Sequence, residues 1–405
     1  MVVAVWCCRR IRSRGRVRGR AHGAPGHVDG GSSYSLVDVA HFARNGHLTP
    51  STERASAPSS QLTGDRTAAA PVHRHQTVAT SAPVDFRRIA ETVYSTGQLF
   101  RGPHTTVRAP PLITQEQLTA GAQIGEGHFG IVHRGLLTVG STQVDVAIKT
   151  NKNRSDESDS HLLQEAVLMA QLMHPNVAEL VGVSLTAETM SVVMRYYTGG
   201  SLHSQLQALV YAASRGAAAL LVGLDVAAGM HYLSQLGLVH RDLASRNVLV
   251  DQSSDPWTYK IADFGLARRM QGGAPDSHYS QQSDLGVALR WTAPEAYLTS
   301  RYSAASDVFS FGVVLWEVFA DGALPYESMG AMEVAIQVNA GFRLTLPVGA
   351  CSAELAATVM ACWDADPERR PTFWALVSQL QAQSGFIPYR ETPAPVLPLQ
   401  MVTLF

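Results

Sequence analysis

The sequence predicts an α+β fold of two lobes, a small β-rich N-lobe with one helix and a larger, mainly α-helical C-lobe. Residues 130–137 and 144–149 alternate apolar and polar side chains, which indicates strands joined by a turn. After Gly199 and Gly200 the pattern changes to the spacing of amphipathic helices. Strands followed by helices along the chain favour two lobes that differ in structure rather than one alternating fold.

The remaining elements follow in chain order. One helix is expected over 157–173, where it packs beside the sheet. Short strands at 180–185 and 190–195 complete a small, mostly antiparallel sheet. Apolar-striped segments that indicate long helices lie at 217–236, 305–320 and 352–363.

Charge divides the chain into two unlike parts. Residues 1–110 contain 15 Arg, no Lys and 6 acidic residues, a net charge of +9, whereas the rest contains 17 basic and 27 acidic residues, a net of −10. We therefore expect a disordered Arg/Gly/Ser/Pro-rich region at 1–113, a folded domain at 117–383 and a Pro-rich tail at 384–405. A PxxP ligand at 395–398 is an alternative interpretation of that tail.

Cysteine usage and apolar segments bear on the compartment. The four cysteines show neither a disulfide framework nor metal-ligand spacing, which favours a reducing, cytoplasmic environment. The longest apolar run, at 311–320, is about half of a membrane span and contains Glu317. The basic N-terminus is interpreted as a disordered tail. The alternatives are a transit peptide, or peripheral membrane association through acylated Cys7 and Cys8 beside the Arg cluster.

A glycine-rich segment opens the folded domain. Gly125, Gly127 and Gly130 form GxGxxG followed by Val132, and glycines let backbone approach phosphate groups closely. A dinucleotide-binding loop has the same pattern, but there a helix follows, whereas here a strand continues. The next strand carries Lys149 in a chain with only three Lys against 29 Arg, so an ammonium contact with α- and β-phosphates is predicted.

Carboxylates and an amide follow at characteristic places. Glu165 has apolar neighbours on both sides of its helix, which favours a partner for Lys149 over a solvated charge. In HRDLASRN, Asp242 can take a proton from an incoming hydroxyl. Asn247 and the Asp263 of DFG can supply hard oxygen ligands to magnesium. His240, Phe264 and Met169 are assigned to an apolar spine.

Residues 117–382 resemble a protein kinase domain, because six motifs occur in that family's order. Besides the segments above, the chain has APE at 293–295, SDVFSFG around Asp307, and CWDADPERRPTF near the end. The resemblance implies that Asp307 holds the backbone of the HRDLASRN segment and that Arg370 pairs with Glu295. It also implies ATP and Mg²⁺ as cofactors.

Three details are similar to tyrosine kinases of the cytoplasmic, non-receptor type. Ala244 and Arg246 stand as in HRDLAARN rather than HRDLKPEN; the segment that ends in APE reads RWTAPE, with Arg290 and Trp291; and CW…DP…RPTF comes near the end. The resemblance implies protein substrates with tyrosine acceptors and no nucleic-acid partner. Ala288 and Phe309 depart from the usual PxKW and DVWSFG. A Ser/Thr or dual-specificity kinase and a binding-only pseudokinase are the alternatives, and the latter lacks support because no catalytic motif residue is lost.

The resemblance also assigns individual residues to the site. Tyr279, 16 residues before Glu295, is expected to be autophosphorylated and to pair with Arg241. The expected catalytic residues are Asp242, Lys149, Glu165, Arg246, Asn247 and Asp263, the last two also binding the metal. The expected nucleotide-binding residues are Ile124, Gly125, Gly127, Gly130, Val132, Ala147, Lys149, Met194, Arg195, Tyr196, Tyr197 and Leu249.

Overall fold

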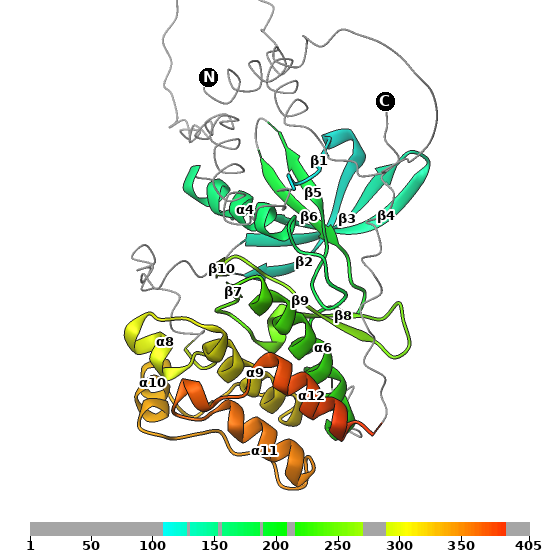
Figure 1. Ribbon diagram of the computed structural model, residues 1–405. Helices are drawn as coiled ribbons and strands as arrows, with labels where there is room; N and C mark the ends of the chain where they lie inside the picture. Colours follow the sequence, from blue (N-terminus) through cyan, green and yellow to red (C-terminus); the bar gives the residue numbers. More distant parts are fainter. Residues whose placement is uncertain are drawn as a thin grey trace, which may run out of the picture.

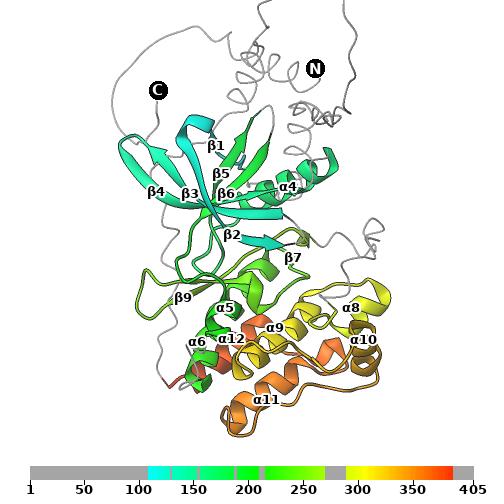
Figure 2. The ribbon, with the colours of Figure 1, turned by 180° about the vertical axis from the view of Figure 1, so that it is seen from behind.

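A computed structural model describes residues 108–127, 130–152, 156–186, 189–208, 215–269 and 289–385. Its described part has the predicted two-lobed α+β architecture. Figure 1 shows a twisted sheet with helix α4 beside it at one end of the molecule and the other helices gathered at the opposite end. The same division is seen from behind in Figure 2. The expected terminal regions fall almost entirely outside the described residues.

The N-lobe is one six-stranded sheet in the order β1-β5-β6-β4-β3-β2. All neighbouring strands are antiparallel except β1 and β5, which are parallel. The register places Lys149 opposite Val132 on one side and opposite Val192 on the other, in the middle of the sheet. The strands are β1 (Leu112–Ile113), β2 (Leu118–Gly127), β3 (Gly130–Val139), β4 (Thr142–Thr150), β5 (Leu180–Leu185) and β6 (Met190–Arg195).

Helix α4 (Asp156–Met169) packs against this sheet, as the sequence predicts, but ends four residues earlier than expected. The chain leaves the helix in a tighter turn, in which the Gln171 N–H donates to the Leu168 carbonyl at 3.0 Å. Pro175 follows soon after, and helices usually end before the residue that precedes a proline. The apolar pattern up to Met173 therefore belongs to a packed turn.

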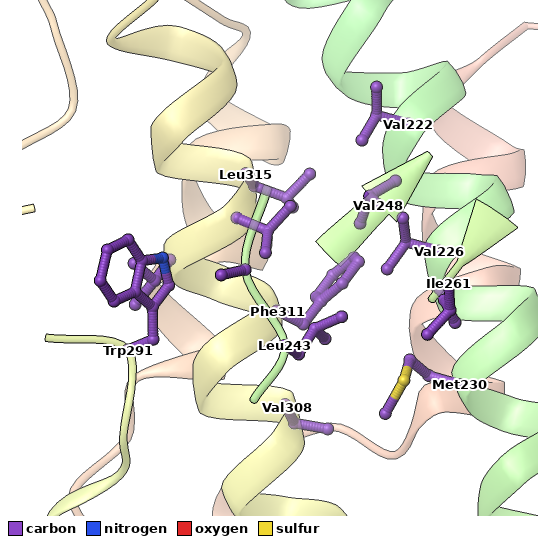
Figure 3. Packing of buried hydrophobic residues seen from close by; sticks show 14 of the residues in the cluster. Val222, Val226, Met230, Leu243, Val248, Ile261, Trp291, Val308, Phe311 and Leu315 are labelled. Carbon is purple, nitrogen blue, oxygen red and sulfur yellow. The ribbon is translucent and has the colours of Figure 1, made fainter. Parts of the chain in front are cut away.

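The C-lobe is built around helix α9. Ser303 caps its start, since the Ser303 hydroxyl accepts from the Ser306 N–H and the Ser306 hydroxyl accepts from the Ser303 N–H. α9 is apolar on nearly every side and buried over most of its length, as expected for a central helix. Figure 3 shows Phe311 and Leu243 between α9 and α6, with Trp291 on the other side of α9. The helices are α5 (Leu202–Gln207), α6 (Arg215–Gln235), α8 (Pro294–Thr299), α9 (Ala304–Phe319), α10 (Ala331–Asn339), α11 (Ala353–Cys362) and α12 (Phe373–Gln383).

Two short antiparallel ribbons lie where the lobes meet. The ribbon of β8 (Val248–Asp251) and β9 (Thr258–Ile261) follows the HRDLASRN segment and leads into Asp263. The second ribbon pairs β7 (Leu238–Val239) with β10 (Arg268–Arg269). The ribbons therefore bring the two chemically important motifs side by side beneath the sheet.

The connection from α4 to β5 is anchored to the C-lobe. The His174 ring stacks on Tyr232 of α6 with ring centres 5.0 Å apart, and the Met173 N–H donates to the Tyr232 hydroxyl at 2.9 Å. The Asn176 side chain donates to the Tyr259 carbonyl at 3.1 Å. The segment that directly follows α4 is thus tied to the helical lobe rather than to the sheet alone.

Helix α6 corrects the expectation that the longest apolar segment of the chain is the run at 311–320. At 21 residues with mean hydropathy 1.4, it is long and apolar enough to cross a membrane by length and composition, and the sequence analysis overlooked it. Within the described residues, however, 61% of its apolar window is buried, and α6 packs against α9 and α12. It fits the central helix of a folded lobe, where apolar residues on several faces meet protein instead of lipid.

Candidate active site

Lys149 forms the centre of a buried ionic cluster. Its ammonium lies 2.9 Å from both carboxylate oxygens of Glu165 on α4 and 3.0 Å from Oδ1 of Asp263. Only 7% of the Lys149 side chain and 4% of the Glu165 side chain are exposed. Burial alone lowers the pKa of the Lys149 ammonium, but Asp263 and Glu165 outweigh it and raise that pKa above its usual range. The cluster therefore fixes a positive charge at the cleft floor.

The HRDLASRN segment is held from below by Asp307 of α9. This buried carboxylate accepts hydrogen bonds from the backbone N–H groups of His240, at 2.8 Å, and Arg241, at 3.0 Å. Arg241 has a φ of 69°, an unusual conformation for a residue with a side chain. The contact implied by the family resemblance is therefore present, and it secures a backbone bend directly before Asp242.

Asp242 is fixed by two neighbours in the same segment. Asn247 Nδ2 donates to the Asp242 carbonyl and to its Oδ2, both at 2.8 Å, and the Arg246 guanidinium donates to Oδ1. Burial raises the pKa of the Asp242 carboxyl, and Arg246 opposes that rise. These contacts fix the direction of the Asp242 carboxylate, which is the group expected to accept a hydroxyl proton.

Asn247 and Asp263 lie together, as a shared metal would require. The Ala262 N–H donates to the Asn247 carbonyl at 2.9 Å, which joins the two motifs through their backbones. Asn247 uses its Nδ2 on Asp242, so its amide oxygen is the atom free for a ligand. Among the described residues no cluster of three or more His, Cys, Asp or Glu could hold a metal ion. One carboxylate and one amide suit Mg²⁺, which takes few protein ligands alongside phosphate oxygens.

The glycines of the β2–β3 turn have different causes. A Cβ on Gly130 would lie 2.1 Å from the Thr150 carbonyl oxygen, and its φ of 142° also favours glycine. Close packing against β4 is therefore one reason for glycine at this position, and the expected role of Gly130 in nucleotide binding stays a prediction. Among the residues that the structure describes, a Cβ on Gly127 would meet nothing within 4 Å, and one on Gly125 would meet only Val132 at 3.8 Å. Packing within the described residues therefore does not require glycine at these two positions.

Several of the residues expected to bind the nucleotide lie in or beside the connection between the lobes. Ala147 and Met194 are opposite each other in the sheet, and Leu249 forms a bridge with Ser201 just beyond this connection. The side chain of Tyr197 points inward, with 4% of the residue exposed, and its hydroxyl accepts from the Glu179 N–H at 3.2 Å. The role expected of Tyr197 concerns its backbone and stays a prediction.

The other expected pocket residues are more exposed. The guanidinium of Arg134 lies 4.9 Å from the ring centre of Tyr196. Ile124 is 46% exposed on β2, and Arg195 is exposed at the end of β6. Ile124 and Arg195 therefore lie at the surface of the N-lobe and are exposed to solvent.

The residues assigned to the apolar spine and the APE motif make the contacts that the sequence indicates. Met169, His240 and Phe264 are each at most 1% exposed, and the rings of His240 and Phe264 lie 5.4 Å apart. Arg370 donates to both Glu295 oxygens, at 2.6 and 2.9 Å. That pair was implied by the resemblance, and it ties the start of α8 to the segment before α12.

Of the two residues expected to have a regulatory role, only Arg241 belongs to the described part of the chain. Tyr279 lies outside the described residues, and the Arg241 guanidinium lies 4.9 Å from the ring centre of Tyr302. Ser245 and Glu317 were given no role from the sequence, yet Glu317 accepts from both the Ser245 N–H and its hydroxyl. The signal for Glu317 was a single carboxylate within the apolar run at 311–320. A charge that survives in a buried helix usually has specific partners.

Comparison with known proteins agrees with this geometry. Residues 118–380 match the family described as protein tyrosine and serine/threonine kinase. The chain is 38% identical over 281 residues to the tyrosine-protein kinase Fer of Rattus norvegicus, covering 67% of this chain and 32% of Fer. It is 39% identical over 269 residues to the megakaryocyte-associated tyrosine-protein kinase of Mus musculus, covering 66% and 50%. The tyrosine-protein kinase ROS of Mus musculus is 35% identical over 283 residues, covering 67% and 12%.

Proposed function

Because this chain belongs to the protein tyrosine and serine/threonine kinase family, we propose that it transfers the γ-phosphoryl group of ATP to tyrosine hydroxyls of protein substrates. The chain spans about a third of the length of Fer, so the activity of the whole protein is proposed from its own site. The observation that carries the proposal is the contact of Lys149 with both Glu165 and Asp263. This contact unites three motifs that phosphoryl transfer by a protein kinase requires together.

Each residue of the site has a part in the transfer. Lys149 neutralises and orients phosphate oxygens, and Glu165 keeps its ammonium in place. Asp242 accepts the proton of the acceptor hydroxyl as that oxygen bonds to the γ-phosphorus and the bond to the ADP oxygen breaks. Asn247 and Asp263 would hold Mg²⁺, which supplies charge neutralisation for the phosphates when bound.

Arg246 supports tyrosine as the acceptor. It stands four residues after Asp242, donates to that carboxylate, and lies over the Trp291 ring at 4.4 Å. A phenol reaches farther than a serine hydroxyl, so the acceptor surface must lie farther from Asp242. A basic residue fixed on the acceptor side, with Ala244 buried where serine/threonine kinases carry Lys, suits the longer side chain.

A phosphotransfer assay with labelled ATP tests the proposal. The chain is given peptides whose only hydroxyl acceptors are tyrosines, and separately peptides whose only acceptors are serine and threonine. Label is expected on the tyrosine peptides alone, and none is expected from the Asp242→Asn variant, which should still bind ATP. Label on the serine and threonine peptides would instead support a serine/threonine or dual-specificity kinase. Binding of ATP without transfer to either set would support a pseudokinase.

Other features of the proposal lie beyond the described site. We propose a kinase domain at 117–383, which the family match at 118–380 supports, flanked by the regions 1–113 and 384–405. A cytoplasmic location is proposed on the family resemblance. Peripheral membrane association through Cys7 and Cys8 is retained as a proposal, which fractionation of Cys7→Ser/Cys8→Ser and wild-type protein would test.

A further inference from the structure

Glu317 is a buried carboxylate that three donors approach. It lies near the end of α9 with 1% of the residue exposed. The Ser245 N–H and the Trp291 indole N–H donate to its Oε2, at 2.9 and 3.0 Å. The Ser245 hydroxyl donates to Oε1 at 2.5 Å. Burying a charge is costly unless its hydrogen-bonding capacity is satisfied, so this arrangement is specific.

The two partners of Glu317 belong to different segments of the site. Ser245 lies in the HRDLASRN segment, and Trp291 lies two residues before the APE motif. Trp291 lies on the side of α9 opposite to α6, as Figure 3 shows, so it is not part of the α6–α9 interface. Glu317 therefore joins, through one side chain, the segment that carries Asp242 and the segment that faces the acceptor.

Both partners act on Arg246. Ser245 precedes Arg246 in the chain, and the indole ring of Trp291 lies 4.4 Å from the Arg246 guanidinium carbon. That guanidinium in turn donates to Oδ1 of Asp242. A guanidinium within about 6 Å of an aromatic ring centre is attracted by the electron-rich face of the ring. The position of the indole thus determines the direction from which Arg246 reaches Asp242.

We propose that Glu317 is a positioning residue for phosphoryl transfer, which fixes Arg246 against Asp242 by holding Ser245 and Trp291 in register. The inference rests on the proposed function, since it concerns the rate of that reaction. The Ser245 hydroxyl is a feature of this chain, because the HRDLAARN pattern that the segment resembles has alanine there. Glu317 touches no reacting atom and acts through its two partners.

Glutamine at 317 should preserve the arrangement. Its amide oxygen can take both N–H donors now shared by Oε2. Its NH₂ would then face Ser245, whose hydroxyl can accept that bond and direct its own proton to His203 Nδ1, 3.4 Å away. Alanine at 317 leaves both N–H groups without an acceptor. The two substitutions therefore separate the hydrogen-bond geometry from the mere presence of a side chain.

Steady-state kinetics with a tyrosine peptide test the proposal. Glu317→Ala is expected to lower kcat about a hundredfold, since small misplacements near a reacting centre have effects of that size. Trp291→Phe keeps the aromatic face but loses the indole N–H, and about a tenfold fall in kcat is expected. Ser245→Ala should lower kcat about threefold, and Glu317→Gln should stay within about threefold of wild type. In every variant the KM for ATP should change by less than about twofold.

Thr358→Val is the matched control. Thr358 is a buried hydroxyl of the same lobe, on α11, that also makes two side-chain hydrogen bonds, to the Glu354 carbonyl and from Gln383. Its loss should lower the melting temperature and leave kcat unchanged. If Glu317→Ala does not fold, Trp291→Phe and Ser245→Ala decide.

Three kinetic results would contradict this proposal while leaving the proposed function intact. Wild-type kcat in both Trp291→Phe and Ser245→Ala would overturn it, and so would an equal loss of kcat in Thr358→Val. A loss in Glu317→Gln as large as that in Glu317→Ala would also overturn it. A wild-type protein that binds ATP but phosphorylates no peptide would contradict the proposed function first, and this inference with it.

Discussion

Lys149 illustrates how much of the site depends on single atoms. Its ammonium is a compact charge with three donors, and the structure occupies them with two carboxylates from different elements. An arginine keeps the charge but is planar and larger, so it cannot occupy the same volume between Glu165 and Asp263. Charge alone is therefore insufficient at this position.

Substitution of this pair should separate charge from geometry. Lys149→Arg is expected to lower turnover at saturating ATP about a hundredfold, because the phosphates lose their alignment. Glu165→Gln should lower it less, about tenfold, since an amide oxygen still accepts a hydrogen bond from Lys149. Turnover of both variants is measured beside wild type. Full activity in Lys149→Arg would mean that this lysine does not anchor phosphate.

At the scale of elements, Arg370 joins segments far apart in the chain. Its side chain is fully buried, donates to both Glu295 oxygens on α8, and also donates to the Ala305 carbonyl at the start of α9. The Phe309 ring, which replaces the usual tryptophan, lies under its guanidinium at 5.2 Å. α8 and α9 are thus fixed relative to the segment before α12 by one cation.

Removing Arg370 should destabilise the fold strongly. Arg370→Ala is expected to cost about 3 kcal/mol in unfolding free energy, because it leaves Glu295 without its buried partner. The neighbouring Arg369 is the control, since it is 75% exposed and its contact with Asp366 is 3.6 Å long. Arg369→Ala should leave the unfolding free energy nearly unchanged. Chemical denaturation measures both, and equal effects would show that the Glu295 contact contributes little.

Elements with strong apolar periodicity could be predicted from the sequence. The strands β5 and β6 and the helices α6, α9 and α11 lie within about two residues of the expected ranges. β1 could not be found, because two residues carry no period and their pairing with β5 is set by distant chain. α12 was missed although Phe373, Leu376, Val377 and Leu380 have helical spacing. The prolines at 367 and 371, shortly before this segment, hid that pattern.

The candidate site, like the fold, could be predicted from the sequence only in part. Motif spacing identified the residues around Lys149 and Asp242, because their types are dictated by charge and metal chemistry. It could not show that Tyr197 points into the core, since a side chain's direction at the end of a strand depends on tertiary packing. Nor could it connect Glu317 with Ser245, which lie 72 residues apart.

At the scale of the whole molecule, the lobes are joined by a contact that should depend on pH. His174 stacks on Tyr232 across the lobe boundary, and burial lowers its pKa to about 4. The unfolded chain titrates near its ordinary value of about 6.5, so between these values the unfolded state binds more protons. The contribution of His174 is therefore complete above about pH 6.5 and is lost as the pH falls toward 4.

The prediction is that His174→Phe flattens this dependence. Wild-type unfolding free energy should fall between pH 7 and pH 4.5 by up to about 3 kcal/mol more than that of the variant. Tyr232→Phe is the control, because it removes the acceptor for the Met173 N–H and leaves His174 in place. It should lower stability by a similar amount at both pH values. An unchanged slope in His174→Phe would refute the assignment.

A second whole-molecule prediction concerns Tyr279, which lies outside the described residues. Incubation with ATP and magnesium before the assay should raise activity toward a peptide, because a phosphate in this segment can pair with Arg241. Tyr279→Phe should abolish that rise while keeping basal activity. An unmodified Tyr279 in fully active protein, found by mass spectrometry, would contradict the switch.

Because the segment after α4 is anchored to the C-lobe, a rotation of α4 would take place about its C-terminal end. Glu165 lies four residues from the end at Met169, about 6 Å along the axis, while Asp156 lies thirteen residues away, about 20 Å. Any rotation about the anchored end therefore moves the far tip about three times as far as Glu165. A small movement of Glu165 away from Lys149 therefore requires a much larger movement of the N-terminal end of α4. A partner that binds this end and restrains it would stabilise the ion pair between Glu165 and Lys149.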